Sequence, residues 1–358
     1  MGQNRAMPTQ QQPAEVEREL VDFAIVGQWM DEQGLGEGPI EDVTPIGGGT
    51  QNVLLRFIRA GRSYVLRRPP RHLREKSNEV LRREARLLRA LSSTTVPAPK
   101  LIAACPDETV MNGAVFYLME PIEGFNPGVE LPALHAGDAD NRHEMGLSAV
   151  RALAKLGSVD YEAVGLSGYG KPEGFLERQV PRWLGELDTY TRNEGYPGPQ
   201  IPGLEEVSDW LERNRPVAGR PGILHGDCHM SNTMYRYDGP ELAAYVDWEM
   251  STIGDPLLDL GWLLATWPNG SELDSLGGAF AAYGGFATPE ELVATYGEHS
   301  DRDLSSIDWY VVLACFKLGI VLEGTYARAC AGKAPKEVGE RLHELTLALF
   351  ERGRQVAA

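Results

Sequence analysis

The chain has 358 residues, 42% of them hydrophobic and 24% charged, which is typical of a soluble globular protein long enough for two lobes. Its formal net charge of −17 opposes binding to DNA, RNA or an anionic membrane, because those partners need a basic surface. No apolar run approaches the roughly 18 residues that cross a bilayer, and the N-terminus lacks a signal-peptide core, so we expect a cytoplasmic protein without a membrane partner.

The N-terminal segment is polar. Residues 1–14 are rich in Gln and contain two prolines, which predicts a disordered tail. Apolar residues then recur on one side of residues 15–33, which predicts a helix. The glycines and proline of GLGEGP, residues 34–39, are expected to end that helix.

A glycine-rich turn follows. Residues 43–58 are predicted to form a strand, a turn and a strand, with IGGGTQN (46–52) at the turn. Gly47, Gly48 and Gly49 expose backbone N–H groups and allow close approach, so this loop can cover nucleotide phosphates. A plain flexible hairpin explains the same glycines. From Arg56 to Lys100 the chain carries 13 Lys and Arg against three Glu, an excess suited to an anionic ligand.

A third strand and a helix continue this region. The strand is predicted over residues 63–67 and the helix over residues 76–91, where apolar residues form one side. VPAP at residues 96–99 breaks the helix, and two further strands are predicted over residues 100–104 and 114–119. Together these strands predict a small sheet.

The segment EPIEG, residues 120–124, is expected to connect two lobes. A strand that leaves a sheet here offers backbone C=O and N–H groups to an adenine edge, so Glu120 and Ile122 are candidate nucleotide contacts. A simple interdomain linker is compatible with this nucleotide-binding role.

The second half of the sequence predicts mainly helices. The expected helices share apolar positions at helical spacing. They cover residues 147–156, 175–183, 255–264 and 308–331. Asp255 and Asp259 open one of them and are expected to brace the preceding loop as caps and backbone acceptors.

The most informative stretch runs from Ile223 to Leu260. Apolar segments at residues 234–237 and 242–246 flank the turn residues DGP, which is a hairpin signature. The antiparallel strands of such a hairpin bring Asn232 close to Asp247. Their oxygen ligands suit Mg²⁺, which binds few protein carboxylates and takes its other ligands from water and phosphates. Asp227, five residues before Asn232, is expected to face the same point as a base.

HGDCHMSN at residues 225–232 resembles the H-G-D-x-x-x-x-N loop of the aminoglycoside phosphotransferase and choline kinase superfamily. It is similar to the protein-kinase loop in which an Asp accepts the substrate hydroxyl proton and an Asn holds magnesium. DWE at residues 247–249 resembles the kinase D-F-G, and GDPLLDL at residues 254–260 also matches the family. The resemblance implies that Asp227 is the catalytic base, that Asn232 and Asp247 hold Mg²⁺, and that ATP is the donor.

The same resemblance implies roles in the N-terminal region. Gly47, Gly48, Gly49 and Thr50 would cover the nucleotide. The next strand of most kinases carries a Lys that pairs with the phosphates. Here the matching residue is Arg67, which can bind phosphate through a bidentate fork but with different geometry. Glu84, on the following helix, would hold Arg67 in place, although an exposed pair with an Arg one helical turn away also explains it.

The acceptor side of the site is less defined. VLRRPP at residue 65, ERQ-x-x-x-W at residue 177 and VDWEM at residue 246 resemble the phosphotransferase subfamily associated with acyl-CoA dehydrogenases. The resemblance implies a small-molecule hydroxyl acceptor, either hydroxyacyl-CoA-like or aminoglycoside-like. Tyr310, Lys317 and Arg328 lie on the implied acceptor helices, but polar groups on a helix are usually solvated, so they are not assigned to the site.

The resemblance covers about residues 40–330 and implies an α+β, two-lobed protein-kinase-like fold. Residues 15–122 are predicted to form the nucleotide-binding lobe, with a leading helix and a small antiparallel sheet. Residues 123–358 are predicted to form a larger, mostly helical lobe for catalysis and acceptor binding. The implied activity is transfer of the γ-phosphoryl group of ATP to a hydroxyl.

Two other functions fit parts of the pattern. His225, Asp227 and His229 are candidates for the metal cluster of a hydrolase, but such a zinc site needs further ligands that no nearby His supplies. An ATP-binding pseudokinase or regulatory module without turnover would explain the replacement of the usual Lys by Arg67. The intact set of Asp227, Asn232 and Asp247 favours the active enzyme.

Overall fold

The structure, a computed structural model, describes residues 20–47 and 52–358. The chain divides into two compact units. Of the described residues, the first unit contains 20–47, 52–92 and 99–122, and the second contains 93–98 and 123–358. The tail predicted for residues 1–14 and the loop residues Gly48, Gly49 and Thr50 lie outside the described residues.

The first unit contains a five-stranded antiparallel sheet with strand order β1-β2-β3-β5-β4. Its elements are α2 (Phe23–Glu32), β1 (Ile40–Pro45), β2 (Val53–Arg59), β3 (Arg62–Arg68), α3 (Ser77–Leu91), β4 (Leu101–Cys105) and β5 (Phe116–Met119). The small antiparallel sheet expected from the sequence is therefore present.

A two-residue turn joins β2 and β3. Ala60 and Gly61 both have positive φ, 48° and 72°, which matches the twist of a tight hairpin. The register that this turn fixes pairs Val53 with Arg68 and Leu54 with Arg67. Arg67 therefore lies near the end of the central strand β3. It is opposite Leu54 at the start of β2, the strand that follows the glycine-rich loop.

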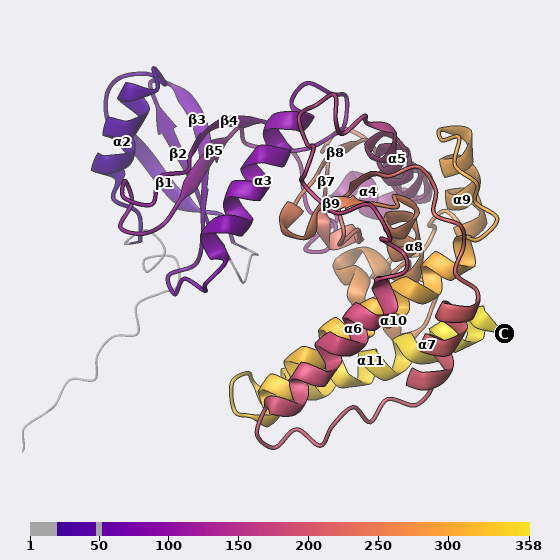
Figure 1. Cartoon of the computed structure of the whole chain (residues 1–358). Coiled ribbons are helices and arrows are strands. Elements are labelled where there is room, and N and C mark those ends of the chain that lie inside the picture. The colour runs from indigo at the N-terminus through magenta and orange to yellow at the C-terminus, as the bar shows by residue number, and fades with distance from the viewer. Residues whose placement is uncertain (1–19, 48–51) are drawn as a thin grey trace, which may run out of the picture. The chain divides into compact units, whose positions relative to one another are not determined.

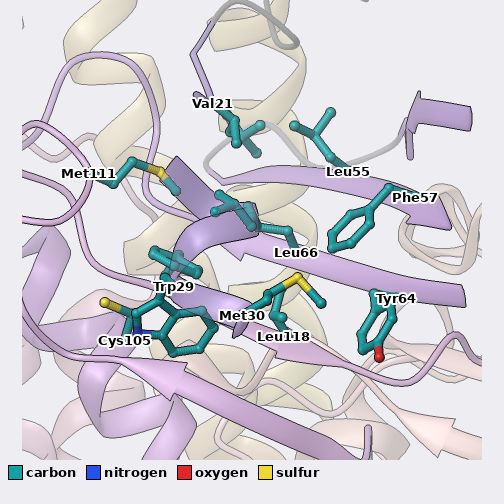
Figure 2. Close-up of a cluster of buried hydrophobic side chains, with 13 residues drawn as sticks. Val21, Trp29, Met30, Leu55, Phe57, Tyr64, Leu66, Cys105, Met111 and Leu118 are labelled. Carbon is teal, nitrogen blue, oxygen red and sulfur yellow. The ribbon is translucent and has the colours of Figure 1, made fainter. Parts of the chain in front are cut away.

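Helix α2 covers a hydrophobic face of this sheet. Figure 2 shows Trp29 and Met30 of α2 among Leu66 and Leu118 of the sheet. The helix predicted over residues 15–33 is wrong for residues 20–22, which are not helical, and α2 begins at Phe23. Residues 15–19 lie outside the described residues. Asp22 sets the start because its Oδ1 accepts the N–H groups of Ala24 and Ile25, which satisfies two free donors of the first turn.

The second unit is mostly helical, as the sequence predicts (Figure 1). Its α-helices are α4 (Ala133–Gly137), α5 (Ala139–Ser158), α6 (Gln179–Thr189), α7 (Leu204–Arg213), α8 (Leu257–Ala265), α9 (Pro289–Glu298), α10 (Ile307–Cys330) and α11 (Lys336–Ala357). Its strands and 3₁₀ helices are η1 (Tyr190–Arg192), β6 (Gly222–Leu224), η2 (Met230–Asn232), β7 (Thr233–Tyr235), β8 (Leu242–Tyr245), η3 (Trp248–Met250), β9 (Thr252–Gly254) and η4 (Glu272–Ala282).

Helix α10 is the centre of this unit and packs against α8 and α11 (Figure 1). Nearly every residue in its first half is buried, because apolar residues occupy most sides of this half rather than one. The helix predicted over residues 175–183 is wrong in its start. Residues 175–178 form turns, and α6 begins at Gln179. No helix within the described residues is long and apolar enough to cross a membrane.

Candidate active site

In the second unit, strand β6 pairs with β9 in antiparallel fashion and leads into the HGD segment, residues 225–227. The segment leaves β6 at Leu224 and is held by Asp259, in the first turn of α8. The Asp259 carboxylate accepts the backbone N–H of His225 at 2.7 Å and that of Gly226 at 2.8 Å. Only 2% of Asp259 is exposed, and this burial raises its pKa. Asp259 therefore holds this loop as a backbone acceptor, as the sequence predicts.

Gly226 is required by the local geometry. Its φ is +87°, a left-handed conformation that favours glycine. A Cβ at this position would lie 2.4 Å from the carbonyl oxygen of Met250. The chain can therefore pass close to η3 only because residue 226 has no side chain.

The His225 ring orders the loop from inside. It is fully buried, and its Nε2 lies 2.8 Å from the Val246 carbonyl while its Nδ1 lies 3.3 Å from the Asp227 backbone N–H. A carbonyl can only accept, so Nε2 donates and Nδ1 accepts, which is the neutral tautomer. Burial lowers the pKa of His225, in agreement with a neutral ring. Both ring nitrogens are engaged, so His225 does not supply a ligand to a hydrolase metal cluster.

Asp227 lies at the end of this loop and is joined to Asn232. Asn232 Nδ2 donates to Asp227 Oδ2 at 2.9 Å and to the Asp227 carbonyl at 3.0 Å, and His229 Nε2 lies 3.5 Å from the same Oδ2. Burial raises the pKa of Asp227, but the hydrogen bond and charge of His229, together with the charge of Lys317, outweigh it and lower the pKa to about 2. The carboxylate is therefore ionised at neutral pH.

The predicted hairpin is present and brings the two proposed metal ligands together. Strands β7 and β8 pair Thr233 with Tyr245, and the backbone N–H of Val246 donates to the Asn232 carbonyl at 2.9 Å. Asn232 and Asp247 thus lie at the same end of the hairpin. Asp247 has φ 63° and ψ 66°, a left-handed conformation that Asp tolerates better than most residues and that is frequent at functional sites.

These groups fit a magnesium ion by their chemistry. The Asn232 amide nitrogen is engaged by Asp227, so the end of that side chain available to a cation is its oxygen. Asp247 adds a carboxylate, and both are the hard oxygen ligands that Mg²⁺ prefers. Within residues 20–47 and 52–358 no three His, Cys, Asp or Glu side chains form a metal cluster, so a site built by the protein alone is not indicated.

The first unit holds the other group of predicted residues. Arg67 Nε of β3 lies 3.1 Å from Glu84 Oε2 of α3, and the two side chains are 9% and 2% exposed. The predicted pairing is thus present, and the exposed alternative for Glu84 is wrong because the carboxylate is buried. Arg68 is turned elsewhere, since its guanidinium donates to the carbonyls of Leu20 and Pro69.

The remaining predicted nucleotide contacts are only partly described. Gly47 is exposed just after β1, next to the residues that the structure does not describe. Glu120 follows β5, where its backbone N–H donates to Lys100 and its carboxylate pairs with Arg62 at 3.0 Å. The N–H of Glu120 is therefore used within the sheet. Ile122 is half-buried at the last position of the first unit.

One group near the HGD segment carries no local sequence signal. Lys317 lies on α10, 91 residues after Gly226, and its Nζ donates to the Gly226 carbonyl at 3.0 Å. The expectation that polar groups on this helix are solvated is wrong for Lys317 and Tyr310, which are 6% and 2% exposed, and correct for Arg328, which is exposed. Tyr310 instead donates to Asp255 at 2.8 Å.

Solved structures resemble most of this chain. A "putative aminoglycoside phosphotransferase" from Ralstonia eutropha matches with a TM-score of 0.75 and 25% identity, covering 93% of this chain and 98% of that one. Aminoglycoside phosphotransferase APH(4)-Ia in complex with ADP and hygromycin B matches with a TM-score of 0.54 and 13% identity, covering 90% and 97%. Macrolide 2′-phosphotransferase type I matches with a TM-score of 0.57 and 15% identity, covering 91% and 98%. The fold is therefore kinase-like.

Characterised sequences resemble the chain as well. Human acyl-CoA dehydrogenase family member 11 is 29% identical over 318 residues, which is 86% of this chain and 39% of the human protein. Mouse acyl-CoA dehydrogenase family member 10 is 27% identical over 320 residues, 88% of this chain and 29% of the mouse protein. The chain thus spans about two fifths of the length of the first of these relatives and less of the second.

The family comparison covers both units. The model of the phosphotransferase enzyme family matches residues 42–294, from β1 through the HGD segment and the β7–β8 hairpin to α9. That range is more than two thirds of the sequence and contains every site residue that the motifs predict. The chain belongs to the phosphotransferase enzyme family.

Proposed function

We propose that the chain transfers the γ-phosphoryl group of ATP to a hydroxyl of a small molecule. Asp227 would accept the hydroxyl proton, Asn232 and Asp247 would hold Mg²⁺, and Arg67, held by Glu84, would contact the triphosphate. Family membership supports phosphotransfer in general, and the assignment of each residue is the proposal.

One observation carries this proposal. The side chain of Asn232 donates to the Asp227 carboxylate, and the hairpin that starts at Asn232 brings Asp247 to the same end. A base for the acceptor and two oxygen ligands for a cation are thus joined in one hydrogen-bonded group. Phosphoryl transfer needs this arrangement, because positioning and charge neutralisation account for most of its catalysis.

The state of Asp227 defines what it can do. With a pKa of about 2, the carboxylate is a weak base that stays ionised and orients the acceptor hydroxyl by accepting its hydrogen bond. The acceptor oxygen bonds to the γ-phosphorus as the bond from that phosphorus to ADP breaks. The hydroxyl proton then passes to Asp227, because the acceptor hydroxyl becomes strongly acidic as its oxygen bonds to phosphorus.

A magnesium ion, when bound, would neutralise phosphate charge in this site. The protein's own part is to hold the ligands in place. Asn232 is fixed by its two bonds to Asp227, and Asp247 by the hairpin register. In the first unit, the buried pair of Arg67 and Glu84 presents a fixed cation for the triphosphate.

For the acceptor, we propose a hydroxyacyl-CoA-like molecule rather than an aminoglycoside. Lys317 is close enough to Asp227 for the two charges to affect each other's pKa, so a buried cation lies in the surroundings of the proposed base. It would repel a polycationic aminoglycoside and favour a neutral or anionic acceptor. The names of the relatives, acyl-CoA dehydrogenase family members, support an acyl-CoA chemistry.

The test is to incubate the purified chain with Mg²⁺ and γ-labelled ATP in the presence of hydroxyacyl-CoA thioesters or of aminoglycosides. We expect label to pass to the thioester, and Asp227→Asn to prevent this transfer. Label on the aminoglycoside would overturn the acceptor assignment alone. ATP binding without label on any acceptor, and without slow ATP hydrolysis, would favour a pseudokinase and refute the proposed activity.

A further inference from the structure

Lys317 is a buried cation at the centre of the second unit. Its ammonium donates to the carbonyl of Gly226, the residue directly before Asp227, at 3.0 Å. The N–H of the same glycine donates to Asp259. Side chains from α10 and α8 therefore hold both backbone polar groups of Gly226, its C=O and its N–H. Because Gly226 also has no room for a side chain, the backbone has little freedom where it turns into Asp227.

Two tryptophans surround the same ammonium. Lys317 Nζ lies 4.4 Å from the ring centroid of Trp262 on α8 and 5.5 Å from that of Trp183 on α6. Cation–π contacts of this kind stabilise a desolvated ammonium. Trp183 is the tryptophan of the ERQ-x-x-x-W motif, so that motif contributes directly to the surroundings of Lys317. Three helices thus converge on one charged atom.

A buried charge is costly unless its surroundings compensate for it. A Met or Leu would fill the same space at lower cost, because the neighbours of Lys317 in this part of α10, such as Phe316 and Leu318, are apolar. The ammonium instead contacts the loop that carries Asp227 and interacts with the Asp227 charge. These contacts connect the lysine to the site of reaction rather than to the core in general.

We propose that Lys317 is a positioning residue for phosphoryl transfer. It holds the Gly226 carbonyl so that the backbone directs the Asp227 carboxylate to the acceptor hydroxyl. This inference rests on the phosphotransferase function proposed above. It adds to the HGD motif a residue that lies outside the family match, which ends at residue 294.

The test compares three variants in steady-state kinetics and thermal unfolding at pH 7.5. Lys317→Met keeps the length of the side chain and removes the charge. Lys317→Arg keeps a cation that can donate to Gly226. Lys155→Met is the control, because it removes an exposed lysine from α5.

For Lys317→Met we expect kcat to fall about 10- to 100-fold, since small displacements of a catalytic group cost this much. The KM for ATP should change less than about 3-fold, because the triphosphate contacts proposed here are on Arg67 and the glycine loop. The melting temperature should stay within about 3 °C of the wild type, since an apolar side chain replaces a buried charge. Lys317→Arg should recover part of the lost kcat, and Lys155→Met should match the wild type.

Other outcomes would overturn the inference. A kcat for Lys317→Met within about 3-fold of the wild type would show that the contact with Gly226 does not affect the reaction. A fall in melting temperature in proportion to the fall in kcat would show a structural lysine. An unchanged kcat with a raised KM for ATP would place its effect on the nucleotide. The three outcomes above all require an active wild type and concern the role of Lys317 alone. Absence of turnover in the wild type would instead refute the proposed function itself.

Discussion

Asn232 donates its side-chain amide to Asp227 twice, at 2.9 Å to Oδ2 and at 3.0 Å to the backbone carbonyl. The proposed metal ligand and the proposed base are therefore one hydrogen-bonded unit. A change at either residue disturbs the other, so the roles are best separated by substitutions that keep this bond. Asp227→Asn is such a change, because its side-chain oxygen still accepts from Asn232.

We predict that Asp227→Asn lowers kcat by about 10²- to 10⁴-fold, the range for loss of a general base. Affinity for MgATP should stay near the wild-type value, because the proposed metal ligands and Arg67 are unchanged. Turnover on an identified acceptor and calorimetric titration with MgATP measure the two effects. If the variant keeps near wild-type turnover, Asp227 is not the base.

We predict that Asp247→Ala weakens MgATP binding at least about 10-fold, equivalent to about 1.4 kcal/mol, because a cation would lose one of its few protein ligands. The control is Asp238→Ala, an exposed carboxylate that pairs with Arg236 in the same hairpin and should leave binding unchanged. Calorimetric titration with ATP in the presence and in the absence of Mg²⁺ separates the contribution of the metal to the affinity. Equal MgATP affinity in the two variants would rule out Asp247 as a ligand.

We predict that Arg67→Lys raises the KM for ATP or lowers turnover although the charge is kept, because an ammonium cannot reproduce a guanidinium fork. Glu84→Gln should cause a similar but smaller defect, since it removes the partner and not the phosphate contact. Arg56→Lys on β2, an exposed position, is the control. A nucleotide-bound crystal structure with Arg67 away from the phosphates would contradict this assignment.

We predict that Asp259→Ala lowers the free energy of unfolding by about 2–4 kcal/mol, because two buried backbone N–H groups lose their acceptor. Asp209→Ala on α7 removes an exposed carboxylate and is the matched control. Urea unfolding of both variants measures the difference. A loss no larger than that of the control would show that water or another group replaces the carboxylate.

We predict a pH dependence of stability that comes from Lys317. Burial lowers its pKa from 10.5 to about 8, while the charges of Asp227 and Asp259 oppose this shift. Between these values the unfolded chain binds more protons than the folded chain, so the free energy of unfolding rises with pH across this window. The other groups that affect this lysine are Arg182 and Cys228.

The shift of about 2.5 pH units corresponds to a gain of about 3 kcal/mol between pH 8 and pH 10.5. The measurement is urea unfolding of the wild type and of Lys317→Met at several pH values in this range. The difference between the two proteins isolates the lysine, since the other titrating groups are common to both. If the free energies of unfolding of the two proteins change with pH in parallel, Lys317 is not the source of the pH dependence.

The sequence determined the features that depend on residues close together in the chain. The spacing of Asp227, Asn232 and Asp247 and the hairpin between them were predictable, because a short turn fixes which residues of two strands lie side by side. The strands of the small sheet followed from apolar segments between turn signals, and its place in a small antiparallel lobe followed from the family resemblance. The partnership of Arg67 and Glu84 followed from the family resemblance, and the structure shows the contact.

Only the tertiary structure decided which polar groups are buried against the HGD segment. Lys317 binds the C=O of Gly226 and Asp259 binds its N–H, yet the two residues lie 91 and 33 residues from Gly226 in sequence. No local pattern encodes such a contact, because it depends on how α8 and α10 pack. A lone lysine in an apolar helix is normally expected to reach solvent, and here the packing of Trp183 and Trp262 keeps it inside.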